Sequence, residues 1–189
     1  MRPPPLPHQL DVLRRILGTV SGWAGARSPA VVFDLDATLF DNRPRTLEIL
    51  MEYREAVADA DPALAEALLA VEVERIDYLL SDTLKNVGIY RADRVKEISD
   101  YWRDRFFSDE YIACDVALEG AAEYVRACYE AGAVIVYLTG RDTPGMLLGT
   151  VAKLRDDGFP IAVAGTELVL KPDRNMSDEA FKRGALPTL

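Results

Sequence analysis

Residues 30–41 read AVVFDLDATLFD, and the interpretation of the whole chain starts from this stretch. Its first four residues form a short, unbroken apolar run, which is typical of a strand buried in a parallel sheet. Two carboxylates, Asp34 and Asp36, follow where the chain leaves the strand. Asp often makes turn and capping hydrogen bonds at such a place, so the pair has an ordinary structural explanation. It also has a chemical one, in which one carboxylate attacks an electrophile, the other moves a proton, and a divalent cation assists.

Further apolar runs predict the rest of the sheet. Residues 133–138 (AVIVYL) follow a helical stretch that ends at Gly132, and Thr143-Pro144 predicts the N-cap and first position of a helix that closes at Gly158. We expect the third strand at Ile161–Ala164. Short apolar strands that alternate with helices predict an α/β fold, a Rossmann-like parallel sheet flanked by helices, with ligands at the carboxyl ends of the strands.

Polar residues also follow the later apolar runs. Thr139, Gly140 and Arg141 offer a hydroxyl, an approachable backbone amide and a guanidinium, a set that suits a phosphate. The same residues are equally typical of a helix N-cap beside a surface ion pair. Lys171 ends the run Leu168-Val169-Leu170, where it either reaches a ligand or is solvated.

The chain between the first two strands carries no strand signal. Apolar residues at helical spacing predict one helix from about Leu47, a second that opens at Asp61-Pro62 and continues through Leu80, and a third over 95–106. We therefore expect a core domain at 30–43 plus 116–189 and an all-helical cap at 44–115, which leaves and rejoins the core beside strand ends and could act as a lid. Residues 1–29 form an N-terminal arm with an amphipathic helix, whose apolar stripe is Leu6, Leu10, Leu13, Leu17 and Val20.

Taken together, three segments resemble the motifs of the haloacid dehalogenase (HAD) superfamily. The first motif of that family is Asp-x-Asp-x-Thr after a strand, matched by Asp34, Asp36 and Thr38; the second is a strand-terminal Thr or Ser, matched by Thr139; the third is a Lys, matched by Lys171. The resemblance covers 31–172, and its specific part is the first motif. The helical insertion resembles the cap of the branch that carries an all-helical lid at this position.

The resemblance implies an Mg²⁺-dependent phosphomonoester hydrolase. Asp34 would be the nucleophile that forms an aspartyl-phosphate, Asp36 the acid and later the base, and Thr38 the residue that orients their loop. Thr139, the Gly140 amide and Lys171 would hold the phosphoryl oxygens. The Asp34 carboxylate and the Asp36 backbone carbonyl would bind Mg²⁺, with a third ligand unknown. An acid two residues after the nucleophile favours an oxygen leaving group, hence phosphate chemistry over dehalogenation.

The substrate class follows from the lid. A helical lid would favour a small phosphorylated metabolite, and three arginines could recognise a second anionic group or could equally be solvated surface: Arg43, Arg45 and Arg141.

One family feature is absent from the sequence. The fourth motif, one or two acids after a further strand, has no match, because Asp178 and Glu179 look like the first turn of a last helix. We expect that the chain is a truncated version of a longer protein. The activity of this truncated chain would then be impaired. The same absence would also fit a non-catalytic relative, or a site that an unusual acid completes. A signalling receiver domain, which also uses an Asp, a Thr and a Lys-Pro, is an alternative of another class, although a receiver has no such helical insertion.

Composition limits the remaining classes. The chain has 22 basic and 31 acidic side chains, a net charge of −9, which disfavours nucleic-acid binding. The single histidine, His8, lies in a proline-rich opening, so Ser/His/Asp and Cys/His systems have no candidate base. Cys114 and Cys128 are expected to be buried, reduced thiols. Without a membrane-spanning run or a signal peptide, we expect a cytoplasmic protein that does not bind membranes, and the oligomeric state cannot be deduced.

Overall fold

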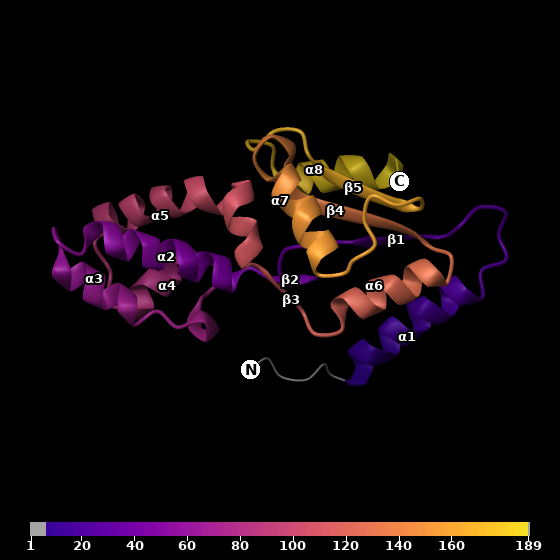
Figure 1. Ribbon diagram of the computed structural model, residues 1–189, viewed down its shortest axis with the longest axis horizontal. Helices are drawn as coiled ribbons and strands as arrows, with labels where there is room; N and C mark the ends of the chain where they lie inside the picture. The colour runs from indigo at the N-terminus through magenta and orange to yellow at the C-terminus, as the bar shows by residue number, and fades with distance from the viewer. Residues whose placement is uncertain (1–6, 189) are drawn as a thin grey trace. The chain divides into compact units, whose positions relative to one another are not determined.

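A computed structural model describes residues 7–188 (Figure 1). The chain divides into two compact units. The first comprises Met1–Phe40 and Ala117–Leu189, and the second comprises Asp41–Val116. The second unit is therefore an insertion between two halves of the first.

The first unit is built on a parallel sheet. Among the described residues its strands are β1 (Ala30–Phe33), β4 (Val134–Asp142) and β5 (Thr166–Lys171), in the order β1-β4-β5. Phe33 lies in register with Tyr137, and Leu138 with Val169. The expectation of an α/β fold with a parallel sheet is thus confirmed.

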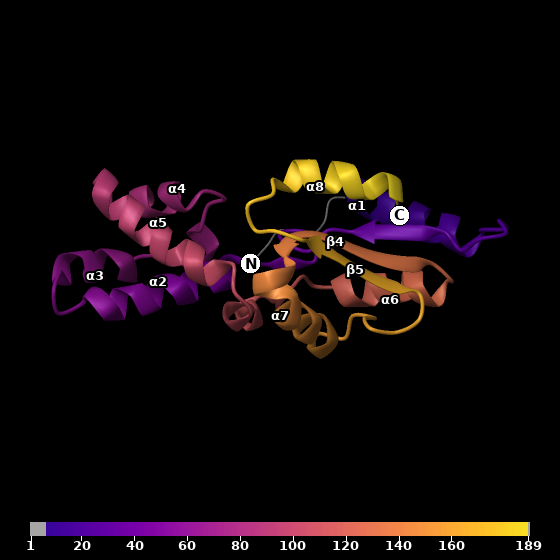
Figure 2. The ribbon, with the colours of Figure 1, turned by 90° about the horizontal axis from the view of Figure 1, so that it is seen from above.

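Helices cover both faces of this sheet. In Figure 2, α6 (Ala121–Glu130) and α7 (Thr143–Asp156) lie on one face and α8 (Asp178–Ala185) lies on the other, followed by the short helix η3 (Leu186–Thr188). The amphipathic helix α1 (Pro7–Ser21) packs against α6, where the Tyr124 hydroxyl donates to the Leu13 carbonyl at 3.0 Å. Leu6, the first residue of its predicted stripe, lies outside the described residues. The core between sheet and helices includes Leu35, Phe40, Val125, Ile135 and Tyr137.

Two local predictions in this unit were wrong. Residues 161–164 lie outside any strand, in a bend that leads into a turn at 164–165, and the third strand begins at Thr166. Two left-handed residues, Ala162 (φ 58°) and Gly165 (φ 80°), reverse the chain there, and a four-residue apolar run carries no signal that separates such a turn from a strand. The N-cap of α7 is Asp142 rather than Thr143, because its carboxylate accepts from the Gly145 amide at 2.9 Å.

The second unit is helical. The chain enters it through β2 (Phe40–Asp41) and leaves it through β3 (Val116–Ala117), two short strands that pair with each other. Between them lie α2 (Arg43–Val57), α3 (Pro62–Leu69), η1 (Val73–Arg75), α4 (Leu80–Asn86), α5 (Ala92–Phe106) and η2 (Asp109–Cys114). Leu50, Leu68, Leu84 and Ile98 are among its fully buried core residues.

The predicted second helix of the insertion was too long. Asp61 caps α3 as expected, accepting from the Leu64 amide at 3.1 Å, but the helix ends at Leu69 and the chain continues through η1 to α4. Val71, Val73 and Ile76 are β-branched and weaken a helix there. The Thr83 hydroxyl also accepts from the Asp77 amide at 2.9 Å and so satisfies a backbone donor outside any helix.

Two further observations bear on the sequence analysis. No helix within residues 7–188 is both long and apolar enough to cross a bilayer. Cys128 is buried as expected, Cys114 is only half-buried, and no disulfide joins them.

Candidate active site at the carboxyl end of the sheet

Strand register brings the three sequence motifs to one edge of the sheet. Asp34 directly follows Phe33, the last residue of β1. Phe33 pairs in register with Tyr137 of β4, and Thr139 lies two residues after Tyr137. On the other side of β4, Asp142 is level with Lys171, the last residue of β5. Because parallel strands end at the same edge, side chains of all three segments meet there.

A tight turn shapes the segment that carries the two aspartates. The Leu35 carbonyl accepts from the amides of Thr38, Leu39 and Phe40 at 3.2, 2.8 and 3.0 Å. Ala37 adopts a left-handed conformation (φ 58°), which costs about 1 kcal/mol for a residue with a Cβ. The turn returns the Thr38 hydroxyl to 3.5 Å from Asp34 Oδ2. The contact links Thr38 to the first aspartate, and its role in orienting the loop stays a prediction.

The Asp34 carboxylate lies against a lysine of α8. Lys182 Nζ donates to Asp34 Oδ1 at 2.7 Å, and the two side chains are 31% and 36% exposed. Asp34 is therefore open to solvent on one side and faces a positive charge on the other. Part of the carboxylate is therefore accessible, which a nucleophile requires.

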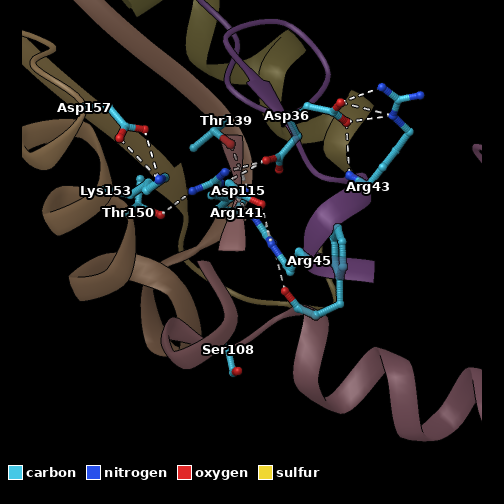
Figure 3. Close-up of polar contacts among 12 residues, drawn as sticks. Asp36, Arg43, Arg45, Ser108, Asp115, Thr139, Arg141, Thr150, Lys153 and Asp157 are labelled. Carbon is cyan, nitrogen blue, oxygen red and sulfur yellow. Dashed lines mark hydrogen bonds and ion pairs between the residues drawn. The ribbon is translucent and has the colours of Figure 1, made fainter. Parts of the chain in front are cut away.

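Asp36 is held by an arginine from β4 (Figure 3). Nη2 and Nε of Arg141 donate to Asp36 Oδ1 at 2.6 and 3.1 Å, and Nη1 donates to the Thr150 hydroxyl at 3.1 Å. Arg141 is 1% exposed, whereas the Asp36 side chain is 34% exposed. The guanidinium thus lies beneath the carboxylate and fixes its direction. A role for Arg141 in direct substrate recognition, as proposed from the sequence, has no support from this position.

The predicted phosphate-binding residues of β4 lie beside this pair. Thr139 is fully buried, and its hydroxyl accepts from the Arg141 amide at 3.2 Å. Gly140 faces the carboxylate of Asp178 so closely that a Cβ on Gly140 would lie 2.6 Å from Asp178 Cγ. Glycine at this position admits the Asp178 side chain.

Lys171 lies at the strand end, as expected, but its ammonium is engaged elsewhere. Nζ donates to Asp178 Oδ1 at 2.7 Å and to the Met176 carbonyl at 3.0 Å, and the side chain is 7% exposed. The lysine that the structure places on Asp34 is Lys182, and Lys171 contacts α8 instead.

The other two candidate arginines belong to the helical unit. Arg43 pairs with Asp41, with Nη2 and Oδ2 at 2.6 Å, and this hydrogen bond raises the pKa of Arg43 above its ordinary value. Arg45 is fully buried, and its guanidinium donates to both oxygens of the buried Asp115 and to the Phe106 carbonyl (Figure 3). The enclosed Arg45 side chain therefore serves the packing of this unit, and substrate recognition by Arg43 stays a prediction.

Sequence reasoning missed two residues, Lys182 and Asp178. The signal that could have found them is their spacing, because residues four apart share one face of a helix. The first-turn acid was interpreted only as a partner of the helix dipole. Nothing in the sequence shows which face of α8 meets the sheet.

The oxygen atoms at the strand end are suited to a hard cation. Mg²⁺ binds one or two carboxylates and completes an octahedron with waters and substrate phosphate oxygens. Asp34 offers a carboxylate whose Oδ2 is not used by Lys182. Within residues 7–188, however, no group of three His, Cys, Asp or Glu residues could hold a metal ion. The strand end thus offers the Asp34 carboxylate as one candidate ligand, and Mg²⁺ binding stays a prediction.

These features define an α/β protein with a parallel sheet, a helical insertion after the first strand and a charged site at the strand ends, consistent with a HAD-like fold. No family model matches the chain, and no curated protein matches it. Among solved structures it is similar to a 1.7 Å crystal structure described as a "Putative Phosphatase from Clostridium difficile", with a TM-score of 0.52 and 19% identity over 86% of this chain and 71% of that chain. It also matches a "predicted phosphatase from Clostridium acetobutylicum" with a TM-score of 0.49 and 18% identity over 85% of this chain and 69% of that one. The first likeness supports the fold.

Proposed function

We propose that the chain is a phosphomonoester hydrolase that acts through an aspartyl-phosphate on Asp34, with a small phosphorylated metabolite as substrate. The observation that carries this proposal is the 2.7 Å contact between Lys182 Nζ and the half-exposed Asp34 carboxylate at the carboxyl end of the sheet. The solved structure of similar fold is itself described as a "Putative Phosphatase".

In the first half of the reaction, an oxygen of Asp34 forms a bond to phosphorus while the bond from phosphorus to the leaving oxygen breaks. Asp36 donates a proton to that leaving oxygen. In the second half, Asp36 accepts a proton from a water whose oxygen forms a bond to phosphorus. The bond between phosphorus and the Asp34 oxygen breaks, which restores the Asp34 carboxylate and releases free phosphate. The contact between Arg141 Nη2 and Asp36 Oδ1, at 2.6 Å, would hold the Asp36 carboxylate in one direction for both proton transfers.

Cations are required because the nucleophile and the substrate are both anionic. At about 4 Å, each pair of like charges repels by about 4 kcal/mol at an effective dielectric constant near 20. Lys182 supplies one compensating charge from α8. We further propose Mg²⁺ as the cofactor, held by the Asp34 carboxylate and the Asp36 backbone carbonyl. When bound, it would neutralise charge on the transferring phosphoryl group.

Hydrolysis of p-nitrophenyl phosphate by the purified chain tests this function. We expect phosphate release in MgCl₂ and its loss in EDTA, with recovery when Mg²⁺ is added back. Release no faster than that of a protein-free blank, from a chain with an intact circular dichroism spectrum, would contradict the phosphatase proposal. Equal rates with and without EDTA would contradict only the metal requirement.

Replacing Lys182 should lower catalysis strongly. Lys182→Met removes the cation that contacts the nucleophile, and a charged hydrogen bond contributes about 1.5–3 kcal/mol, so kcat/KM is expected to fall about 10- to 150-fold. The matched control is Arg183→Met, which removes a positive charge from the next residue of α8. Arg183 pairs with Glu179, and both side chains are largely exposed. Equal losses in the two variants would show that general charge, and not the contact with Asp34, is what matters.

A further inference from the structure

The Lys171 ammonium donates its hydrogen bonds to the segment that leads into α8. Its Nζ donates to three acceptors, Asp178 Oδ1 at 2.7 Å, the Met176 carbonyl at 3.0 Å and the Arg174 carbonyl at 3.5 Å. An ammonium has three hydrogens to donate, and a buried one needs partners for them. The most distant of these acceptors along the chain, Asp178, lies seven residues after Lys171. Lys171 therefore holds this segment, through hydrogen bonds, against the end of β5.

Asp178 also packs closely against the neighbouring strand. Its carboxylate lies directly over Gly140 of β4, where a Cβ would come within 2.6 Å of Cγ and 3.0 Å of Oδ1. A Cβ on Gly140 would therefore require the Asp178 side chain to shift. The Lys171–Asp178 pair thus bonds the end of β5 to the first turn of α8 and places that turn in contact with Gly140 of β4.

The position of Lys182 depends on this attachment. Helix α8 spans only eight residues, Asp178–Ala185, which is too short to be stable without tertiary contacts. Lys182 lies one turn after Asp178 on the same helix face, and its Nζ reaches Asp34. A shift of the first turn would therefore carry Lys182 away from the nucleophile.

We propose that Lys171 and Asp178, seated on Gly140, are positioning residues that hold α8 so that Lys182 meets Asp34. In this arrangement Lys171 acts through Asp178 and Lys182 and does not itself touch the substrate. Pairing with Lys171 also neutralises Asp178, a carboxylate that would otherwise repel an anionic substrate at this edge. The catalytic consequence rests on the proposed phosphatase function, whereas the placement of Lys182 does not.

The test measures the placement of Lys182 and the catalytic rate separately. Lys171→Met, Asp178→Asn, the double variant and Gly140→Ala are acetylated briefly, and the modification of Lys182 relative to Lys153 is determined by peptide mass spectrometry. Lys153 is the internal reference because it pairs with Asp157 at the end of α7. We expect Lys182 to be acetylated several-fold faster in all four variants than in the unmodified sequence. Asp178→Asn is the mildest change and decides the result if the buried Lys171→Met variant does not fold.

The kinetic arm asks whether the two positioning residues act as one unit. We expect about a tenfold loss of kcat/KM in each single variant and no further loss in the double variant. Glu179→Gln is the matched control, since it removes a carboxylate from the same helix turn but from the exposed pair with Arg183, and we expect it to change neither readout.

Three outcomes would overturn the inference. One is a loss of activity in Lys171→Met with unchanged acetylation of Lys182, which would mean that Lys171 contacts the phosphoryl group directly. Another is additive losses in the double variant. The third is a Glu179→Gln effect equal to that of Asp178→Asn. If the unmodified sequence releases no phosphate, the proposed function fails, and the acetylation rates still decide where Lys182 lies.

Discussion

Asp34→Asn is expected to abolish phosphate release from p-nitrophenyl phosphate and to leave the fold intact. An amide cannot form the acyl-phosphate, so we expect kcat/KM to fall by at least about a thousandfold. The fold should survive because the pair with Lys182 is partly exposed, and such pairs contribute about 1 kcal/mol or less. The measurement is initial-rate kinetics together with thermal unfolding.

Two further observations make this prediction specific. Asp156→Asn is the matched control, because it makes the same chemical change in the same unit at an exposed position paired with Arg155, and we expect full activity. Acid-quenched reactions with a labelled phosphomonoester should show protein-bound label in the unmodified sequence and none in Asp34→Asn. Comparable turnover in Asp34→Asn would remove Asp34 from the mechanism.

Arg45→Met is expected to cause a large loss of stability. Arg45 and Asp115 are both buried in the helical unit, where Nε lies 2.8 Å from Oδ1 and the guanidinium carbon lies 4.4 Å from the centre of the Phe106 ring. The substitution leaves the Asp115 carboxylate buried without this counter-ion, which costs about 3–5 kcal/mol. The midpoint of urea unfolding should fall accordingly.

The control for this prediction is an exposed pair of similar geometry. Arg91 donates to both oxygens of Asp93 through Nε and Nη2, but both side chains are largely exposed, so Arg91→Met should leave the midpoint unchanged. Arg45→Met/Asp115→Leu should recover much of the loss, since an apolar pair leaves no buried charge. A midpoint for Arg45→Met equal to that of Arg91→Met would show that the buried pair does not stabilise the unit.

The residues of the first motif illustrate what local sequence can predict. The apolar run before Asp34 predicted β1, and the polar residues after it predicted a site at the strand end. The Thr38 hydroxyl contacts the Asp34 carboxylate, four residues earlier in the chain. Over so short a separation, the hydrogen bonds of the intervening turn set the geometry. These expectations depended only on interactions between residues that are close in the sequence.

The arginines and lysines illustrate what local sequence cannot predict. Arg141 and Arg45 looked equally suited to an anionic substrate, yet each is enclosed and holds an aspartate, Asp36 and Asp115 respectively, of its own unit. A guanidinium has the same chemistry on a surface and in a core. Only burial and the identity of its partner separate the two roles.

The sequence by itself determined the parallel sheet, the helical insertion and the two aspartates at the end of β1, because apolar periodicity and strand-end polarity are local properties of the chain. The tertiary structure decided which lysine contacts Asp34 and which arginine contacts Asp36. Lys182 lies 148 residues after Asp34, and Arg141 lies 105 residues after Asp36. Contacts over such separations depend on strand register and on which face of α8 packs against the sheet, and these are set only when the whole unit folds.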